Sequence, residues 1–266
     1  AFGVHNRSWI EEHSPRDGSV VIDDLTEEFG VINLCGPHAR DVLQNVTEDD
    51  ISNETLPFSS YADIRVAGHP VRAMRIGYVG ELGWEMHMGR ENMPAVYKAL
   101  AEAGSKYDIA DVGYRAIDSL RMEKGYLYWS SDISPDYNPF EAGLGSFIEF
   151  DDRDFVGREA LQVADKSCRT WGMRVTGGVA QLGRVLTIED KVVGRVCSSG
   201  YSPYQGCGVC IVRMNDLLIG PGTKVDVLCS DGSLQRGELC TLPMYDAERL
   251  IPRGKMVDIP TTLIEG

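Results

Sequence analysis

Apolar residues recur in short runs along the first part of the chain, and their spacing changes between strand-like and helix-like. Strands are expected where apolar runs are bounded by turn residues, at 20–25, 29–36 and 63–76. Helices are expected at the start of the chain and where apolar residues recur every three or four positions, at 1–13, 92–106 and 115–124. This mixture predicts an α+β region in which the stretch 63–76 forms a hairpin.

The stretch 76–88 reads IGYVGELGWEMHM, two apolar segments joined by a turn with glycine at every third position. Glycine tolerates a positive φ and allows other atoms to approach the backbone closely. Alternation over 84–88 places Glu85 and His87 on one face of a strand and the apolar side chains on the other. We therefore expect Tyr78 and Glu85 on the two arms of one hairpin-like unit.

The second part of the chain has a different texture. Strand-like runs separated by turn signals follow one another at 171–175, 185–188, 191–197, 208–212, 224–228 and 237–242. Six short strands without a clear helix predict a small antiparallel barrel or sandwich. We expect a first region over 1–165, a β domain over 166–250 and an extended tail over 251–266.

Composition limits the classes of protein to which the chain can belong. The 266 residues are 43% hydrophobic and 25% charged, which is typical of an ordinary globular protein. The formal net charge of −14 argues against nucleic acid or an anionic membrane surface as the main partner. No apolar run approaches the roughly 20 residues that cross a bilayer, so we expect a chain that does not span a membrane. A small anionic ligand stays possible, because local arginines could bind it.

The seven cysteines form no complete metal-binding pattern. Residues 207–210 contain a single CxxC, and no second pair of ligands follows at the spacing of a zinc site. We therefore expect no metal site, and we expect a reducing intracellular compartment.

Three residues are candidates for binding chemistry. Tyr78 supplies a phenol and Glu85 an acceptor carboxylate, a pair that could hold a flat heterocycle bearing N–H donors. The alternative is a surface hairpin on which Glu85 is only solvated. Arg115 lies near the start of a predicted helix, where an arginine can capture a carboxylate. The alternative there is a surface ion pair with Asp111 or Asp118.

Five blocks of sequence, in order and with matching spacing, resemble one known family. They are GPHA at 36–39, YVGELGWE at 78–85, and the blocks at 113–126, 138–144 and 155–161. The chain resembles the folate-binding aminomethyltransferase family, which includes the glycine-cleavage T-protein and the C-terminal halves of sarcosine and dimethylglycine dehydrogenases. Residues 52–59 and 67–75 resemble the sarcosine dehydrogenase branch. The resemblance implies a T-protein-like folate-binding region followed by a small antiparallel β-barrel.

The resemblance also implies a function. Tyr78 and Glu85 would contact the pterin of tetrahydrofolate, with Glu85 accepting the ring N–H groups, and Arg115 would lie beside the folate. By this resemblance, a small methylated amine is oxidatively demethylated, and the chain captures the released one-carbon unit on tetrahydrofolate. The product would be 5,10-methylenetetrahydrofolate. The expected location is the mitochondrial matrix in a eukaryote and the cytoplasm otherwise.

The chain departs from the family's pattern at its start. The family carries an aspartate beside folate N5 in an upstream segment, and the dehydrogenase branch has a flavin domain before it. Neither is found in these residues, and no GxGxxG lies at a strand–helix junction, so FAD is expected only in an N-terminal domain outside this chain. A flavin domain or larger assembly is therefore the expected partner, and no catalytic residue is assigned.

Two other interpretations stay open. One is a glycine-cleavage T-protein-like aminomethyltransferase, and the other is a non-catalytic structural or partner subunit derived from this family. The resemblance implies an enzyme, or part of one, and leaves the activity of this chain by itself open.

Overall fold

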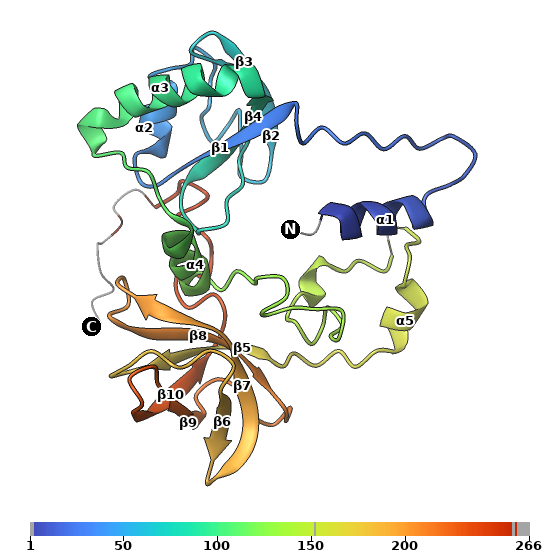
Figure 1. Ribbon diagram of the computed structural model, residues 1–266, viewed down its shortest axis with the longest axis vertical. Helices are drawn as coiled ribbons and strands as arrows, with labels where there is room; N and C mark the ends of the chain where they lie inside the picture. Colours follow the sequence, from blue (N-terminus) through green and yellow to red (C-terminus); the bar gives the residue numbers. More distant parts are fainter. Residues whose placement is uncertain (1–2, 152, 257–258, 260–266) are drawn as a thin grey trace.

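The computed structural model describes residues 3–151, 153–256 and 259, and it contains two folded bodies joined by a helix (Figure 1). The first body is a four-stranded antiparallel sheet with helices on one face. The second is a closed barrel of six antiparallel strands. The α+β fold with a small antiparallel barrel is confirmed, and closure of the strands decides between barrel and sandwich.

The sheet has the strand order β1-β4-β3-β2. Its elements are β1 (Phe29–Cys35), α2 (Ala39–Gln44), β2 (Tyr61–Val66), β3 (His69–Met74), β4 (Gly83–Gly89), the 3-10 turns at Arg90–Asn92 and Ser105–Tyr107, and α3 (Met93–Gly104). The hairpin predicted over 63–76 is present as β2 and β3, which pair from Tyr61 opposite Met74 to Val66 opposite His69. Its turn is Ala67-Gly68, and both residues have a positive φ.

One face of the sheet is a packed core, and the alternation along β4 explains why. Trp84, Met86 and Met88 are at most 1% exposed and pack with Val96 and Leu100 of α3. Because side chains alternate along a strand, Glu85 and His87 point to the opposite face. The sequence prediction of these two faces is confirmed.

The beginning of the chain differs from the prediction. Helix α1 (Gly3–His13) forms, but none of its residues is buried. A long arm connects α1 to β1 (Figure 1), and residues 20–25 form no strand in it. An apolar run becomes a strand only when its backbone finds a ladder partner, and Val21 on this arm is 79% exposed. The predicted strand at 20–25 is therefore wrong.

The barrel has the order β10-β5-β8-β7-β6-β9. Its strands are β5 (Thr170–Val175), β6 (Val185–Ile188), β7 (Lys191–Ser202), β8 (Cys207–Met214), β9 (Lys224–Leu228) and β10 (Leu234–Cys240). Side chains from every strand fill the barrel and include Met173, Leu186, Val196, Val212 and Val225. Closure leaves no free edge among these strands.

Helix α4 (Tyr114–Glu123) connects the two bodies. Met122 of α4 packs against Val209 and Ile211 on the outside of β8. The chain then runs through the 3-10 turn Gly145–Phe147 and α5 (Arg158–Val163) before it enters β5. The sheet and the barrel are thus held together through the outer face of β7 and β8.

The segment after the barrel turns back to the first body. The Arg75 Nη2 donates to the Pro252 carbonyl at 3.4 Å, and the Asn53 Nδ2 donates to the Gly254 carbonyl at 3.2 Å. Residues 251–256, the start of the expected tail, therefore pack against the sheet body. Residues 257, 258 and 260–266 of that tail lie outside the described residues.

Candidate functional site

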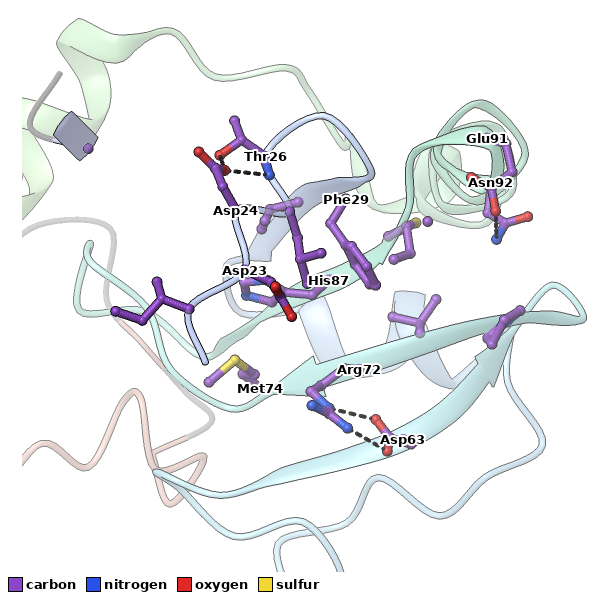
Figure 2. A pocket seen from close by; sticks show the side chains of 18 of the residues that line it. Asp23, Asp24, Thr26, Phe29, Asp63, Arg72, Met74, His87, Glu91 and Asn92 are labelled. Atoms are coloured by element: carbon purple, nitrogen blue, oxygen red, sulfur yellow. Dashed lines mark hydrogen bonds and ion pairs between the residues drawn. The ribbon is translucent and has the colours of Figure 1, made fainter. Parts of the chain in front are cut away.

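A groove of about 1880 Å³ lies on the sheet body. It lies between the arm that contains α1 and the face of the sheet that points away from α2 and α3. Figure 2 shows Arg72, Met74 and His87 reaching from the sheet toward the arm that carries Asp23. The groove can receive a ligand because the arm covers this face of the sheet only loosely.

The groove walls combine apolar and charged side chains. Phe29 and Val31 of β1 line it and are about half exposed, and Met74 lines it from β3, two strands away in the sheet. The Arg72 guanidinium donates to both oxygens of Asp63, at 2.8 and 3.0 Å (Figure 2). Such a wall suits a flat, partly apolar ring with polar groups at its edge.

Glu85 and His87 are neighbours on this face of the sheet. The Glu85 Oε2 lies 3.7 Å from the His87 Nε2, and each side chain is about 30% exposed. The His87 Nε2 is itself buried and has no hydrogen-bond partner among the described residues. Glu85 also sits opposite Met74 in the β3–β4 register. Since His87 and Met74 line the groove, Glu85 is at its margin, with a carboxylate that can accept N–H groups.

Tyr78 lies in the loop between β3 and β4, not on a strand arm as the sequence suggested. Its hydroxyl donates to the Leu127 carbonyl at 2.6 Å, and its ring stacks on Tyr126 with centroids 5.9 Å apart. Burial raises the pKa of the Tyr78 phenol. The donor capacity of this phenol is therefore already used by the protein.

Arg115 is exposed in the first turn of α4. The alternative surface ion pair of Arg115 with Asp111 or Asp118 is not formed: Asp111 instead accepts from the Tyr97 hydroxyl at 2.9 Å, and Asp118 from Arg121 at 2.7 Å. Across the part of the chain that the structure describes, no hydrogen bond or ion pair joins Arg115 to Tyr78 or Glu85. The structure thus places Glu85 beside His87 and Met74, which line the groove, without making Glu85 part of the lining itself, and it leaves Tyr78 and Arg115 on separate elements.

The glycines of the motif have a structural explanation. Gly80 has a φ of +76°, and a Cβ there would lie 2.5 Å from the Lys124 Cγ. A Cβ on Gly83 would lie 2.5 Å from the Leu34 carbonyl oxygen, whereas a Cβ on Gly77 would meet open space. At Gly80 and Gly83, therefore, other atoms of the protein itself occupy the space that the missing side chain leaves.

A buried network of charges at α4 was not singled out from the sequence. Arg121 is 2% exposed and donates to Asp132 at 2.5 Å and to the Ser198 hydroxyl at 2.8 Å. Lys124 forms an ion pair of 2.6 Å with Asp246. One sequence feature could have indicated this network: Arg121 and Lys124 lie three residues apart, next to the apolar stripe of a predicted helix. The network fixes the helix that carries Arg115.

The side chains and helices that the structure describes also bear on metal sites and membrane-spanning helices. Within the described ranges, no group of three or more His, Cys, Asp or Glu side chains could hold a metal ion. No helix that the structure describes combines the length and the apolar character needed to cross a bilayer.

Comparison with known proteins gives consistent relatives. Mitochondrial sarcosine dehydrogenase of Mus musculus is 47% identical over 170 residues, which are 64% of this chain and 17% of that protein. Mitochondrial dimethylglycine dehydrogenase of Mus musculus is 37% identical over 210 residues, 75% of this chain and 24% of that protein. The chain thus spans about a fifth of the length of these dehydrogenases.

A solved structure shares the fold. The glycine cleavage system aminomethyltransferase T from Bartonella henselae superposes with a TM-score of 0.70 at 25% identity, over 82% of this chain and 60% of that one. The model of the GCVT N-terminal domain matches residues 1–152, more than half of the chain. The relatives, the fold and this match agree with the five sequence blocks, and the chain belongs to the GCVT N-terminal domain family.

Proposed function

We propose that this chain is the folate-binding part of a sarcosine dehydrogenase-like enzyme and receives the one-carbon unit of an N-methyl amine on tetrahydrofolate. The observation that carries the proposal is the position of Glu85. It ends the YVGELGWE motif, projects from the open face of β4 and lies beside a groove large enough for a folate. The 47% identity to a sarcosine dehydrogenase supports the choice of enzyme.

The residues at the groove fit the pterin ring of a folate. A pterin is flat and carries N–H donors along one edge, which the Glu85 carboxylate accepts in this proposal. The unpartnered Nε2 of His87 supplies a second polar contact next to it. Phe29 and Met74 give apolar surface for the ring faces. Tetrahydrofolate supplies the amine that accepts the one-carbon unit, and this chain orients it and shields it from water.

Tyr78 and Arg115 have supporting roles in this proposal. With its hydroxyl bonded to Leu127, Tyr78 acts through its ring and its position in the motif loop. Arg115 is exposed, and no described side chain neutralises it, so its guanidinium is available for the carboxylates of the folate tail.

The amine site and the flavin are proposed to lie outside these residues. A flavin domain would oxidise the amine. Sarcosine and dimethylglycine are the candidate substrates, because the relatives are named as sarcosine dehydrogenase and dimethylglycine dehydrogenase. Both relatives are named as mitochondrial, so we propose a mitochondrial location if the source is a eukaryote.

Calorimetric titration with 5-formyltetrahydrofolate, a stable reduced folate, tests the proposal. Glu85→Gln keeps the shape of the side chain and removes its charge, so we expect affinity to fall by about tenfold or more. Glu238→Gln on the outside of the barrel makes the same change of charge and should leave affinity unchanged. Equal affinities for wild type and Glu85→Gln would sink the assignment of the pterin site.

A T-protein-like aminomethyltransferase is the second candidate, favoured by the TM-score of 0.70 to an aminomethyltransferase. Turnover with an aminomethyl-lipoyl donor separates the two functions. Activity with that donor would replace the dehydrogenase assignment, whereas folate binding without such turnover would support it.

A further inference from the structure

A second cavity lies at the outer face of the barrel, where residues of the chain before α5 meet β7 and β8. Its volume is about 380 Å³. It is lined by Tyr137, Glu141, Arg169, Arg195, Arg213, Met214 and Asn215. None of these residues lines the groove, and none is Tyr78, Glu85 or Arg115, the residues proposed to bind folate.

Three arginines converge on this cavity from neighbouring strands. Arg195 of β7 and Arg213 of β8 sit directly opposite each other in the antiparallel ladder. Arg213 is opposite Thr170 on its other side, so Arg169 at the entrance to β5 is the next neighbour. Like charges directly opposite in a sheet destabilise it. In a chain with a net charge of −14, such a cluster needs a reason.

Arg213 is the most demanding member of the cluster. Arg213 is only 6% exposed, and its Nε and Nη1 have no hydrogen-bond partner among the described residues. Its Nη2 donates to the Asp132 carbonyl at 3.2 Å, and the guanidinium lies 3.3 Å from the centroid of the Tyr137 ring. A buried charged donor without a partner is costly, and a bound ion or water is the usual explanation.

The carboxylates near the cavity are found at Arg169. Glu141 lines the cavity and lies 3.6 Å from the Arg169 Nε while also accepting from the Asn138 backbone N–H at 3.1 Å, and Asp165 lies 3.6 Å from the Arg169 Nη2. Arg195 donates to the Tyr137 hydroxyl, which is neutral. Arg213 lines the cavity and keeps two N–H groups without an acceptor, and no described carboxylate pairs with it.

We propose that this cavity binds a small oxyanion, a phosphate or carboxylate group, between Arg213, Arg195 and Arg169. Guanidinium groups donate charge-assisted hydrogen bonds to such anions, and the Nε and Nη1 of Arg213 are each left without an acceptor. The anion would also neutralise the repulsion between Arg195 and Arg213. Because the site lies on the barrel, it stands independently of the proposed folate site.

Calorimetric titration of the whole chain with inorganic phosphate tests the site, at constant ionic strength set with sodium chloride. Thermal unfolding in the same buffers gives a second readout, since a ligand that binds the folded state raises Tm. We expect wild-type binding with a rise in Tm, and a loss of affinity of about tenfold or more in Arg195→Gln and Arg213→Gln. Arg195 is exposed, so Arg195→Gln remains informative if Arg213→Gln fails to fold.

Arg236→Gln is the matched control, because Arg236 is an exposed arginine of β10 paired with Asp226 at 3.3 Å. It should bind phosphate as the wild type does. Succinate in place of phosphate distinguishes the source of the oxyanion: binding of phosphate alone indicates a phosphoryl ligand, and binding of succinate alone a carboxylate. Binding of neither anion, or equal binding by wild type and both cavity variants, would mean that Arg213 only packs on Tyr137.

Discussion

Buried ionisable side chains gather at the C-terminal end of α4, and Glu123 is the clearest case. It is 1% exposed, and its Oε1 has no partner among the described residues. Burial raises the pKa of the Glu123 carboxyl, while hydrogen bonds from the Ser202 side chain and the Tyr204 backbone oppose the shift in part. At neutral pH this residue therefore opposes folding, because the folded state must hold a charge away from water.

Glu123→Gln should change how stability depends on pH. The folded protein keeps the Glu123 proton to a higher pH than the unfolded chain, whose carboxyl has a pKa near 4.5. Stability from this group is thus full below the unfolded pKa and is lost as pH rises through the folded pKa. Glutamine does not titrate, so the variant should gain stability over wild type as pH rises from about 4.5 to neutrality.

Urea unfolding at a series of pH values measures this difference. Glu248→Gln, at an exposed position, is the control and should follow the wild-type curve. Parallel curves for wild type and Glu123→Gln would show that the carboxyl has the same pKa in both states.

Among the connecting elements, the loop between β3 and β4 depends most directly on glycine. Gly80→Ala places a Cβ in a left-handed conformation and 2.5 Å from the Lys124 Cγ. We expect a loss of about 1–2 kcal/mol of unfolding free energy from the conformation, and more if Lys124 cannot move. Gly77→Ala in the same loop meets open space and should change stability by less than about 0.5 kcal/mol. Chemical denaturation of the two variants decides, and equal losses would contradict this account.

The same elements show what the sequence could and could not predict. The stretch 84–88 was predicted correctly because one face of β4 is packed and the other is open, which alternation records directly. The strand predicted at 20–25 is absent, because a strand needs a hydrogen-bonding partner strand, which a local sequence pattern cannot specify. The alternation along β4 also predicts that Glu85 lies on the open face, beside the groove-lining His87. The Tyr78 bond to Leu127 could not be predicted in this way, because it joins residues 49 positions apart. The arginine cavity likewise depends on the β7–β8 register.

At the scale of the whole molecule, the C-terminal segment ties the two bodies together. Lys124 at the end of α4 pairs with Asp246, which follows the barrel, and donates to the Asp246 carbonyl at 3.0 Å. Asp246 also accepts from the Leu250 and Ile251 backbone N–H groups, at 2.7 and 3.2 Å. These bonds direct the following residues back to the sheet body, where Arg75 binds the Pro252 carbonyl. The pair therefore couples α4, the barrel exit and the sheet.

Asp246→Asn tests this coupling with little change of shape. Asparagine keeps an oxygen for the backbone N–H groups but leaves the buried Lys124 ammonium without its counter-charge. Breaking one side of a buried ion pair costs about 3–5 kcal/mol, so calorimetry should show a lower Tm and separate transitions for the sheet body and the barrel. The double variant Lys124→Met with Asp246→Leu removes both charges and should recover part of the loss. A single transition at the wild-type Tm in Asp246→Asn would show that the apolar contact of Met122 with β8, and not the ion pair, joins the two bodies.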